Sequence, residues 1–300
     1  MGDYLGFLPP IVRATASINA RISERNPSAQ ILGKERMGTG AVVSPDGHIL
    51  TVNYIVLGAK EITVSLYDRR QFPARIVYQD YNTGLAVIQI ACSKLPTVPL
   101  GNSDDLRQSD KTLIVASVSK HERRATQGFI TALRRFDAYW EYMLDRAIIT
   151  TTVNPGFGGG PLLTNRGQMV GTVSLNLNTL REMTLAIPIN FYHQVREEAL
   201  GGSHKRRRPR PWLGVYTENV ENAVVVVQTV PRGPANRADL RAKDIIVEVN
   251  GREVSTRHEF YEEIWKCSAG DELTLTLLRG EDLTVVRAAT MDRAEFYAPV

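Results

Sequence analysis

Cysteine, long apolar runs and a strong excess of one charge are all missing from this sequence. Two cysteines among 300 residues exclude a disulfide scaffold and a cysteine-rich zinc site. No apolar run reaches 18 residues, which excludes a membrane-spanning helix. Lysine and arginine total 36 against 32 acidic residues, and the net charge of +4 is too small to indicate a nucleic-acid-binding protein.

The first ten residues also lack the pattern of a secretory signal. They carry no positively charged stretch and are interrupted by Pro9 and Pro10. We therefore expect a cytoplasmic protein by default, or an exported one whose leader was removed before this numbering begins.

The remaining composition is typical of a globular protein. Hydrophobic residues make up 43% and charged residues 23%, and a length of 300 residues predicts two or three domains. One helix is predicted over residues 190–200, with Phe191, Val195 and Ala199 on its apolar face. Short runs rich in valine, isoleucine and threonine predict an all-β sandwich or barrel before it: residues 41–43, 49–56, 62–66, 85–90, 113–118, 129–133 and 169–175.

A basic segment follows the predicted helix. Residues 201–211 hold five lysine and arginine residues together with glycine and proline, and no aliphatic or aromatic residue. We interpret residues 193–211 as the helix end and a solvated linker. A patch for nucleic acid or acidic lipid is the alternative, which is less favoured because no aromatic residue interleaves the charges.

The last ninety residues predict a separate α+β module. A strand is predicted at 223–230, an Asn-Gly hairpin turn at 250–251 and a half-buried strand at 273–278. A helix is predicted between the last two, because Phe260, Ile264 and Cys267 recur at spacings of four and three.

One loop carries a candidate site. Residues 154–162 read Asn-Pro-Gly-Phe-Gly-Gly-Gly-Pro-Leu, so four glycines fall within five residues. Such a loop exposes backbone N–H groups, which suits a phosphate cradle or an oxyanion hole, and a glycine-rich structural turn remains open. Phosphate is disfavoured because a proline and a strand-like run follow the loop, where a phosphate loop has lysine and a helix.

This loop resembles the NPGNSGGPL nucleophile loop of the HtrA (DegP-type) trypsin-like serine proteases. Residues 38–51 (GTGAVVSPDGHILT) are similar to the family's GSGFIISPDGYILT, and residues 80–90 (DYNTGLAVIQI) to its DPKTDLAVLKI. Residues 100–104 and 186–190 also match. The resemblance implies a mainly β fold, with a chymotrypsin-like double β-barrel over residues 10–192.

The catalytic positions depart from the family. A serine protease needs a hydroxyl nucleophile, an imidazole base and a carboxylate that orients the base. The family's histidine falls at Tyr54, its aspartate at Gly84 and its serine at Gly158. A phenol with an ordinary pKa of about 10 is a poor base at neutral pH, and glycine offers neither hydroxyl nor carboxylate. We therefore expect a pseudoprotease rather than an active enzyme.

No other residue is expected to replace the triad. We expect His48 in a hairpin turn and His121 in a charged loop to be surface imidazoles, and Ser117 and Ser174 to be strand residues of the second barrel. None of the five histidines has the spacing of a metal pair. The sequence therefore predicts no metal site and no cofactor.

The emptied site leaves two alternatives open. The backbone N–H groups of Gly156 and Gly158 are candidates for a residual oxyanion loop, together with Phe157, in a groove that holds a peptide without cutting it. Alternatively, the side chains of Tyr54 and Phe157 plug the cleft.

Residues 212–295 resemble the PDZ domain that follows HtrA proteases. Trp212, Leu213, Gly214 and Val215 are similar to the family's carboxylate-binding YLGV loop, and residues 231–251 match further PDZ segments except at the Arg-Ala-Lys turn of 241–243. The resemblance implies that a peptide adds as a strand beside Val215 while loop N–H groups capture its C-terminal carboxylate. It also implies that Phe260 and Ile264 line a pocket for the terminal side chain. A PDZ domain that serves only as an interdomain strut is the alternative.

The functional hypothesis is a catalytically inactive HtrA-like protein that binds peptides or protein C-termini as a scaffold, regulator or quality-control adaptor. The alternative is an endopeptidase with relocated or partner-dependent activity. The family resemblance implies a homotrimer formed through the N-terminal segment, or a mixed oligomer with an active homologue, and a periplasmic location if a leader was removed. Packing of this segment on its own barrel remains open; its apolar residues are Tyr4, Leu5, Phe7 and Leu8.

Overall fold

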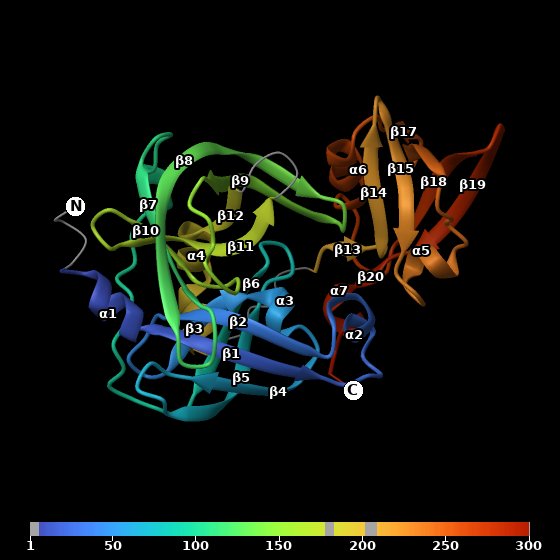
Figure 1. Cartoon of the computed structure of the whole chain (residues 1–300). Coiled ribbons are helices and arrows are strands. Elements are labelled where there is room, and N and C mark those ends of the chain that lie inside the picture. Colours follow the sequence, from blue (N-terminus) through green and yellow to red (C-terminus); the bar gives the residue numbers. More distant parts are fainter. Residues whose placement is uncertain (1–5, 178–182, 202–208, 300) are drawn as a thin grey trace. The chain divides into compact units, whose positions relative to one another are not determined.

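The computed structural model describes residues 6–177, 183–201 and 209–299. The chain forms two compact units, both rich in strands (Figure 1). The first unit comprises Met1–Arg135, Asp145–Lys205 and Pro299–Val300, and the second comprises Phe136–Leu144 and Arg206–Ala298. The second unit therefore contains a short piece of chain that is far away in the sequence from its main part.

The first unit begins with a closed six-stranded barrel in the order β1-β2-β3-β6-β5-β4. Ile18, Leu50 and Ile88 are fully buried and belong to its core, as inward-facing residues of a small barrel do. The strands are β1 (Thr15–Ile22), β2 (Glu35–Val42), β3 (His48–Val52), β4 (Ala59–Ser65), β5 (Gln71–Gln79) and β6 (Leu85–Ile90), and the short helices are α1 (Leu8–Arg13), α2 (Pro27–Leu32) and α3 (Asn53–Val56).

A second closed barrel follows in the order β10-β11-β12-β9-β8-β7, which confirms the predicted double β-barrel. Its strands are β7 (Lys111–Ser117), β8 (Arg123–Ala138), β9 (Tyr142–Thr150), β10 (Pro161–Thr164), β11 (Met169–Leu177) and β12 (Met183–Pro188), and a 3₁₀ turn, η1 (Ser103–Asp105), precedes them. Each strand contributes to one apolar cluster: Ile114, Ile130, Ile148, Leu162, Val173 and Ala186.

Helix α4 (Ile189–Gly201) closes the first unit where a helix was predicted. Its buried face differs by one residue from the prediction, because Tyr192, Val195 and Ala199 are buried whereas Phe191 is only partly so. Spacings of three and four follow the helical period more closely than two spacings of four. Residues 202–208 of the predicted linker lie outside the described residues.

The second unit is built on one antiparallel sheet in the order β14-β15-β16-β18-β19, with β17 paired to β16. Strand β14 is therefore an edge strand, as predicted. The elements are β13 (Pro211–Trp212), β14 (Val215–Val220), β15 (Ala223–Thr229), α5 (Pro234–Arg237), β16 (Ile245–Val249), β17 (Arg252–Glu253), α6 (Arg257–Ile264), β18 (Glu272–Arg279), β19 (Asp282–Ala289), β20 (Met291–Asp292) and α7 (Arg293–Phe296).

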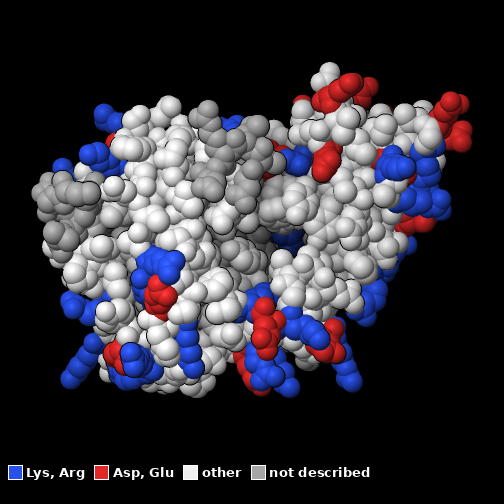
Figure 2. Space-filling model, in the orientation of Figure 1, with Lys and Arg blue, Asp and Glu red and all other residues white. Residues whose placement is uncertain are grey.

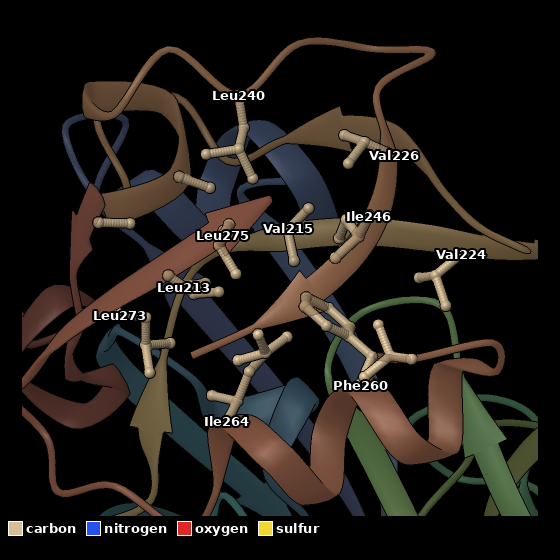
Figure 3. Close-up of a cluster of buried hydrophobic side chains, with 14 of the residues drawn as sticks. Leu213, Val215, Val224, Val226, Leu240, Ile246, Phe260, Ile264, Leu273 and Leu275 are labelled. Atoms are coloured by element: carbon tan, nitrogen blue, oxygen red, sulfur yellow. The ribbon is translucent and has the colours of Figure 1, made fainter. Parts of the chain in front are cut away.

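The core of this unit lies between the sheet and α6. A capping box of Thr256 and Glu259 starts the helix and satisfies its first N–H groups. Phe260 and Ile264 project from α6 into the cluster of apolar side chains that covers the sheet (Figure 3). The expected α+β module is thus present, although Cys267 lies beyond the helix end at Ile264.

Charged side chains of both signs lie close together on the visible face (Figure 2). Three exposed ion pairs of the first unit are of this kind: Arg21–Glu61, Lys34–Glu24 and Arg70–Asp68. Exposed pairs of this type add little stability. In the described parts of the chain, no helix is long and apolar enough to cross a membrane.

The N-terminal segment packs on its own barrel where it is described. Tyr4 and Leu5 lie outside the described residues. Phe7 lies against Gly167, where an added Cβ would be 2.6 Å from the Phe7 ring. The homotrimer remains a prediction.

Candidate functional site

The three predicted triad positions, Tyr54, Gly84 and Gly158, lie close together in the first unit. Asn53, the residue before Tyr54, donates its N–H to the carbonyl of Gly84 at 2.7 Å. A Cβ built on Gly158 would be 2.2 Å from the Tyr54 hydroxyl. Strand ends and loops of the two barrels thus converge at this point.

Tyr54 is held at both ends. Its carbonyl accepts a hydrogen bond from Arg36 Nη1 at 2.8 Å, and its hydroxyl donates to the carbonyl of Ser174 at 2.9 Å. Burial raises the pKa of the Tyr54 phenol to about 12. A phenol with this pKa is protonated at neutral pH, and its hydrogen bond is donated to a carbonyl oxygen.

Gly84 occupies a turn with a left-handed backbone, φ +79°. Asp80 is close in sequence, but its carboxylate is used within the same turn. One oxygen accepts the N–H of Asn82 and the other accepts the hydroxyl of Thr83, both at 2.8 Å. The turn thus supplies no carboxylate from position 84, and the nearby one stabilises the turn itself.

The glycine-rich loop is bound to the first barrel through Thr39 of β2. The Thr39 N–H donates to the carbonyl of Gly158 at 2.7 Å, and its hydroxyl donates to the carbonyl of Phe157 at 2.7 Å. Gly159 has φ +93°, and a Cβ there would lie 2.1 Å from the Thr39 carbonyl oxygen. Close packing therefore requires glycine at this position, whatever the loop does chemically.

Two N–H groups of the loop have partners inside it or beside it. The N–H of Gly156 donates to Asn154 Oδ1 at 3.4 Å, and that of Phe157 donates to the carbonyl of Ser117 at 2.9 Å. The Phe157 side chain is partly buried. Neither the residual oxyanion hole nor the peptide groove is tested by this geometry, and both stay predictions.

The prediction for one histidine was wrong. His48 is the first residue of β3, pairs with Gln89 and is only 8% exposed, because the strand begins earlier than the turn pattern indicated. Burial lowers the pKa of His48 below its ordinary value. His121 is exposed, and Ser117 and Ser174 are strand residues, as predicted.

The predicted carboxylate-binding loop holds a carboxylate from the same unit. Three consecutive N–H groups converge on Glu141: Leu213 donates to Oε2 at 3.1 Å, and Gly214 and Val215 donate to Oε1 at 2.6 and 2.9 Å. Gly214 has φ +75° and lies against the Trp212 ring, so this curved backbone requires glycine. Such successive N–H groups form an anion-binding nest.

The Trp212 ring packs against Gly214 of this loop. Phe260 and Ile264 are the other two residues predicted for the peptide site. The Trp212 ring lies 4.8 Å from Phe296 and 5.5 Å from Tyr297, measured between ring centroids. Phe260 and Ile264 are fully buried in the same apolar cluster as Leu213, Val215 and Met143. All six predicted peptide-site residues are thus in one unit, around one loop and one helix face.

Sequence reasoning missed the partner of this loop. Glu141 lies in the turn between β8 and β9 and Met143 lies at the start of β9, and both are assigned to the second unit. The available signal was the apolar character of this turn, Tyr139-Trp140-Glu141-Tyr142-Met143, since a solvated turn is usually polar.

Comparisons with known proteins agree with both folds. Residues 38–171 match the model of the trypsin-like peptidase domain, and residues 211–290 match that of the PDZ domain. Both domains are similar to those of the HtrA/DegP family. The first match includes all three predicted triad positions.

Two curated relatives are named probable periplasmic serine endoprotease DegP-like. The protein of Pseudomonas savastanoi is 29% identical over 98% of this chain and 65% of its own length, and that of Halomonas elongata is 30% identical over 84% and 56%. The chain thus spans 65% and 56% of the lengths of these relatives.

Solved structures share the fold. The HtrA-type protease AlgW with a tripeptide has a TM-score of 0.60 at 24% identity, with 97% of each chain covered. The serine endoprotease from Yersinia pestis has a TM-score of 0.58 at 23% identity, covering 97% of this chain and 98% of its own.

Proposed function

We propose that this HtrA-like chain binds peptides or protein C-termini through its PDZ domain without cleaving them. It would act as a scaffold, a regulator or a protein quality-control adaptor. The observation that carries this proposal is the nest of three N–H groups at Leu213, Gly214 and Val215, which already holds a carboxylate.

Two further features support peptide binding. Strand β14 is the edge of its sheet, and PDZ domains take peptides by adding a strand to such an edge. One solved relative is titled as an HtrA-type protease with a decapeptide, which makes a peptide the natural ligand class to test here.

The site around Tyr54 supports the absence of cleavage. Gly158 has no hydroxyl, and the space where a side chain would begin is taken by the Tyr54 phenol. With Gly84 in place of the aspartate, the chain lacks the nucleophile, the base and the carboxylate at once. In subtilisin, loss of the serine alone costs a factor of roughly 10⁶ in kcat.

The cellular location is proposed from the similarity to these relatives. The curated relatives carry the word periplasmic in their names. We propose the periplasm, which fractionation of cells that express the full-length gene would test.

Labelling of the purified chain with a fluorophosphonate tests the catalytic half of the proposal, with an active DegP-like relative as positive control. We expect no labelling and no casein hydrolysis. Labelling at the rate of the relative would overturn this half of the proposal and favour relocated chemistry.

A library of peptides with free C-termini, titrated onto the full chain, tests the binding half. Gly214→Ala should weaken peptide binding about tenfold or more, because the left-handed backbone of the nest is lost. Gly251→Ala is the matched control, since Gly251 also has a left-handed φ, +76°, but lies in a hairpin turn with open space around it. Equal loss in both variants would contradict a role of the nest.

A further inference from the structure

The turn between β8 and β9 lies along the predicted peptide groove. The turn and the strand ends that flank it, Phe136–Leu144, are called the β8–β9 turn below and belong to the same compact unit as Arg206–Ala298. The N–H of Thr217, on the edge strand β14, donates to the carbonyl of Tyr139 at 2.9 Å. This is the type of backbone bond that an added peptide strand makes with a sheet edge.

Glu141 reaches the carboxylate nest from this turn. Its side chain accepts all three N–H groups of the nest, and the residue is only 4% exposed. Its backbone has φ +53°, a left-handed conformation that is uncommon outside glycine. A strained turn that aims a buried carboxylate at three donors indicates a fitted contact rather than loose packing.

The backbone of the turn is also fixed by buried polar groups. Tyr261 Oη donates to the carbonyl of Ala138 at 2.7 Å and accepts the N–H of Glu141 at 2.8 Å. Arg293 donates to the carbonyls of Trp140 and Glu141 at 3.2 and 3.1 Å. Side chains of the PDZ domain thus hydrogen-bond the backbone of the turn at Ala138, Trp140 and Glu141.

Met143 supplies an apolar group beside the carboxylate. It is 9% exposed and belongs to the cluster of Phe260 and Ile264, the residues predicted to receive a terminal side chain. At the rim, Arg257 Nε pairs with Asp137 Oδ2 at 2.5 Å and the rings of Tyr139 and Tyr216 lie 5.7 Å apart. Backbone, carboxylate and apolar contacts of a bound peptide all have a counterpart in this turn.

We propose that Phe136–Leu144 is an internal ligand that regulates the peptide site. The Glu141 carboxylate takes the place of a ligand's C-terminal carboxylate, and the Met143 side chain takes the place of its terminal apolar side chain. This inference rests on the proposed peptide binding. The turn must leave before a peptide enters, so the apparent affinity is the intrinsic affinity reduced by the fraction of open sites. The peptide that competes best with the turn should therefore have an aliphatic residue or a methionine at its C-terminus, with a free carboxylate.

The test uses the full chain and a fluorescent decapeptide that ends in a methionine with a free carboxylate. Glu141→Ala removes three charge-assisted bonds from the internal ligand and leaves the nest intact. We expect this variant to bind the peptide at least tenfold more tightly than the wild-type chain. Asp145→Ala, an exposed acid in the same hairpin, is the matched control and should not change the affinity. The same peptide with a C-terminal amide should bind neither chain.

Hydrogen exchange provides a second readout that does not depend on the variant's fold. Saturating peptide should increase the exchange of amides 138–143 in the wild-type chain. Equal affinity of the wild-type and Glu141→Ala chains, without increased exchange, would overturn the internal ligand and leave peptide binding intact. A failure of the wild-type, Glu141→Ala and Met143→Ala chains to bind would instead overturn the proposed function.

Discussion

The hydroxyl of Tyr54 lies where any side chain at position 158 would have to begin. A Cβ on Gly158 would be 2.2 Å from that oxygen, and the hydroxyl is fixed there by its bond to the Ser174 carbonyl. The replacement of the histidine and the replacement of the serine are therefore sterically linked. Restoring the serine while Tyr54 remains would place two groups in the same space.

Gly158→Ser should lower the free energy of unfolding by about 1–3 kcal/mol, as overpacking does. Tyr54→Ala should relieve the clash, so the double variant should be more stable than the sum of the two single effects predicts, by more than about 1 kcal/mol. Urea denaturation of the four proteins measures this coupling. Strict additivity would show that Tyr54 and Gly158 do not share this space.

Tyr261→Phe should loosen the β8–β9 turn. Removal of the hydroxyl leaves the Glu141 N–H and the Ala138 carbonyl without their partner, at a cost of about 1–3 kcal/mol for buried groups. Amide exchange of residues 136–144 should increase in this variant. Tyr67→Phe, at an exposed tyrosine, serves as the control. Unchanged exchange in the Tyr261 variant would mean that the turn is held by other contacts.

Acid should destabilise the PDZ domain through Asp244. Burial by itself would raise the pKa of this carboxyl, but hydrogen bonds from Arg279 and the Arg241 N–H outweigh burial and hold the pKa below its usual range. The stabilisation is therefore present above the ordinary pKa of about 4 and is lost as the pH falls through the lower folded value. Asp244→Asn should cost about 2 kcal/mol at pH 7 and flatten the dependence of stability on pH below 4.

Measurements of melting temperature from pH 3 to pH 7 test this. The exposed pair of Arg70 and Asp68 offers the control, Asp68→Asn, which should have little effect at pH 7. A pH profile of Asp244→Asn parallel to that of the wild-type chain would contradict the assignment.

His48 should make the barrel sensitive to mild acid. Burial depresses the pKa of this imidazole below 6.5 in the folded chain, so the unfolded chain binds the proton more tightly. The folded state loses stability as the pH falls below about 6.5, until the ring is protonated there as well. His48→Gln should remove this slope. Proton NMR of the imidazole should give a pKa under 6.5, and a value above it would contradict the prediction.

Much of the fold could be predicted because strands and turns leave local patterns in the sequence. The strand runs around Leu50, Ile88 and Ile114 have the length and turn spacing of barrel strands, and all three are buried in strands. Positions 54, 84 and 158 could be predicted as the triad positions because the segments around them resemble the motifs of the family. Strand starts were less certain: the turn signal before His48 led to an exposed residue being expected where β3 already begins.

The contact between Glu141 and the nest could not be predicted from sequence. The carboxylate and the Leu213 N–H are 72 residues apart, and the turn has no motif that marks it as a ligand. Its geometry depends on the positive φ of Glu141 and on the buried hydroxyl of Tyr261, neither of which leaves a periodic trace. The sequence shows that the turn is apolar, but it does not show that the turn contacts the nest.

Because Phe136–Leu144 belongs to the second unit, this unit is not a single continuous stretch of the chain. A fragment cut at the limits of the PDZ match, residues 211–290, would lack Glu141, Met143 and the backbone partner of Thr217. It would also end before Arg293, which holds the turn. Such a fragment would present an empty nest and an open apolar pocket. Under the proposed internal ligand, peptide affinities measured on this fragment should be higher than those of the intact chain.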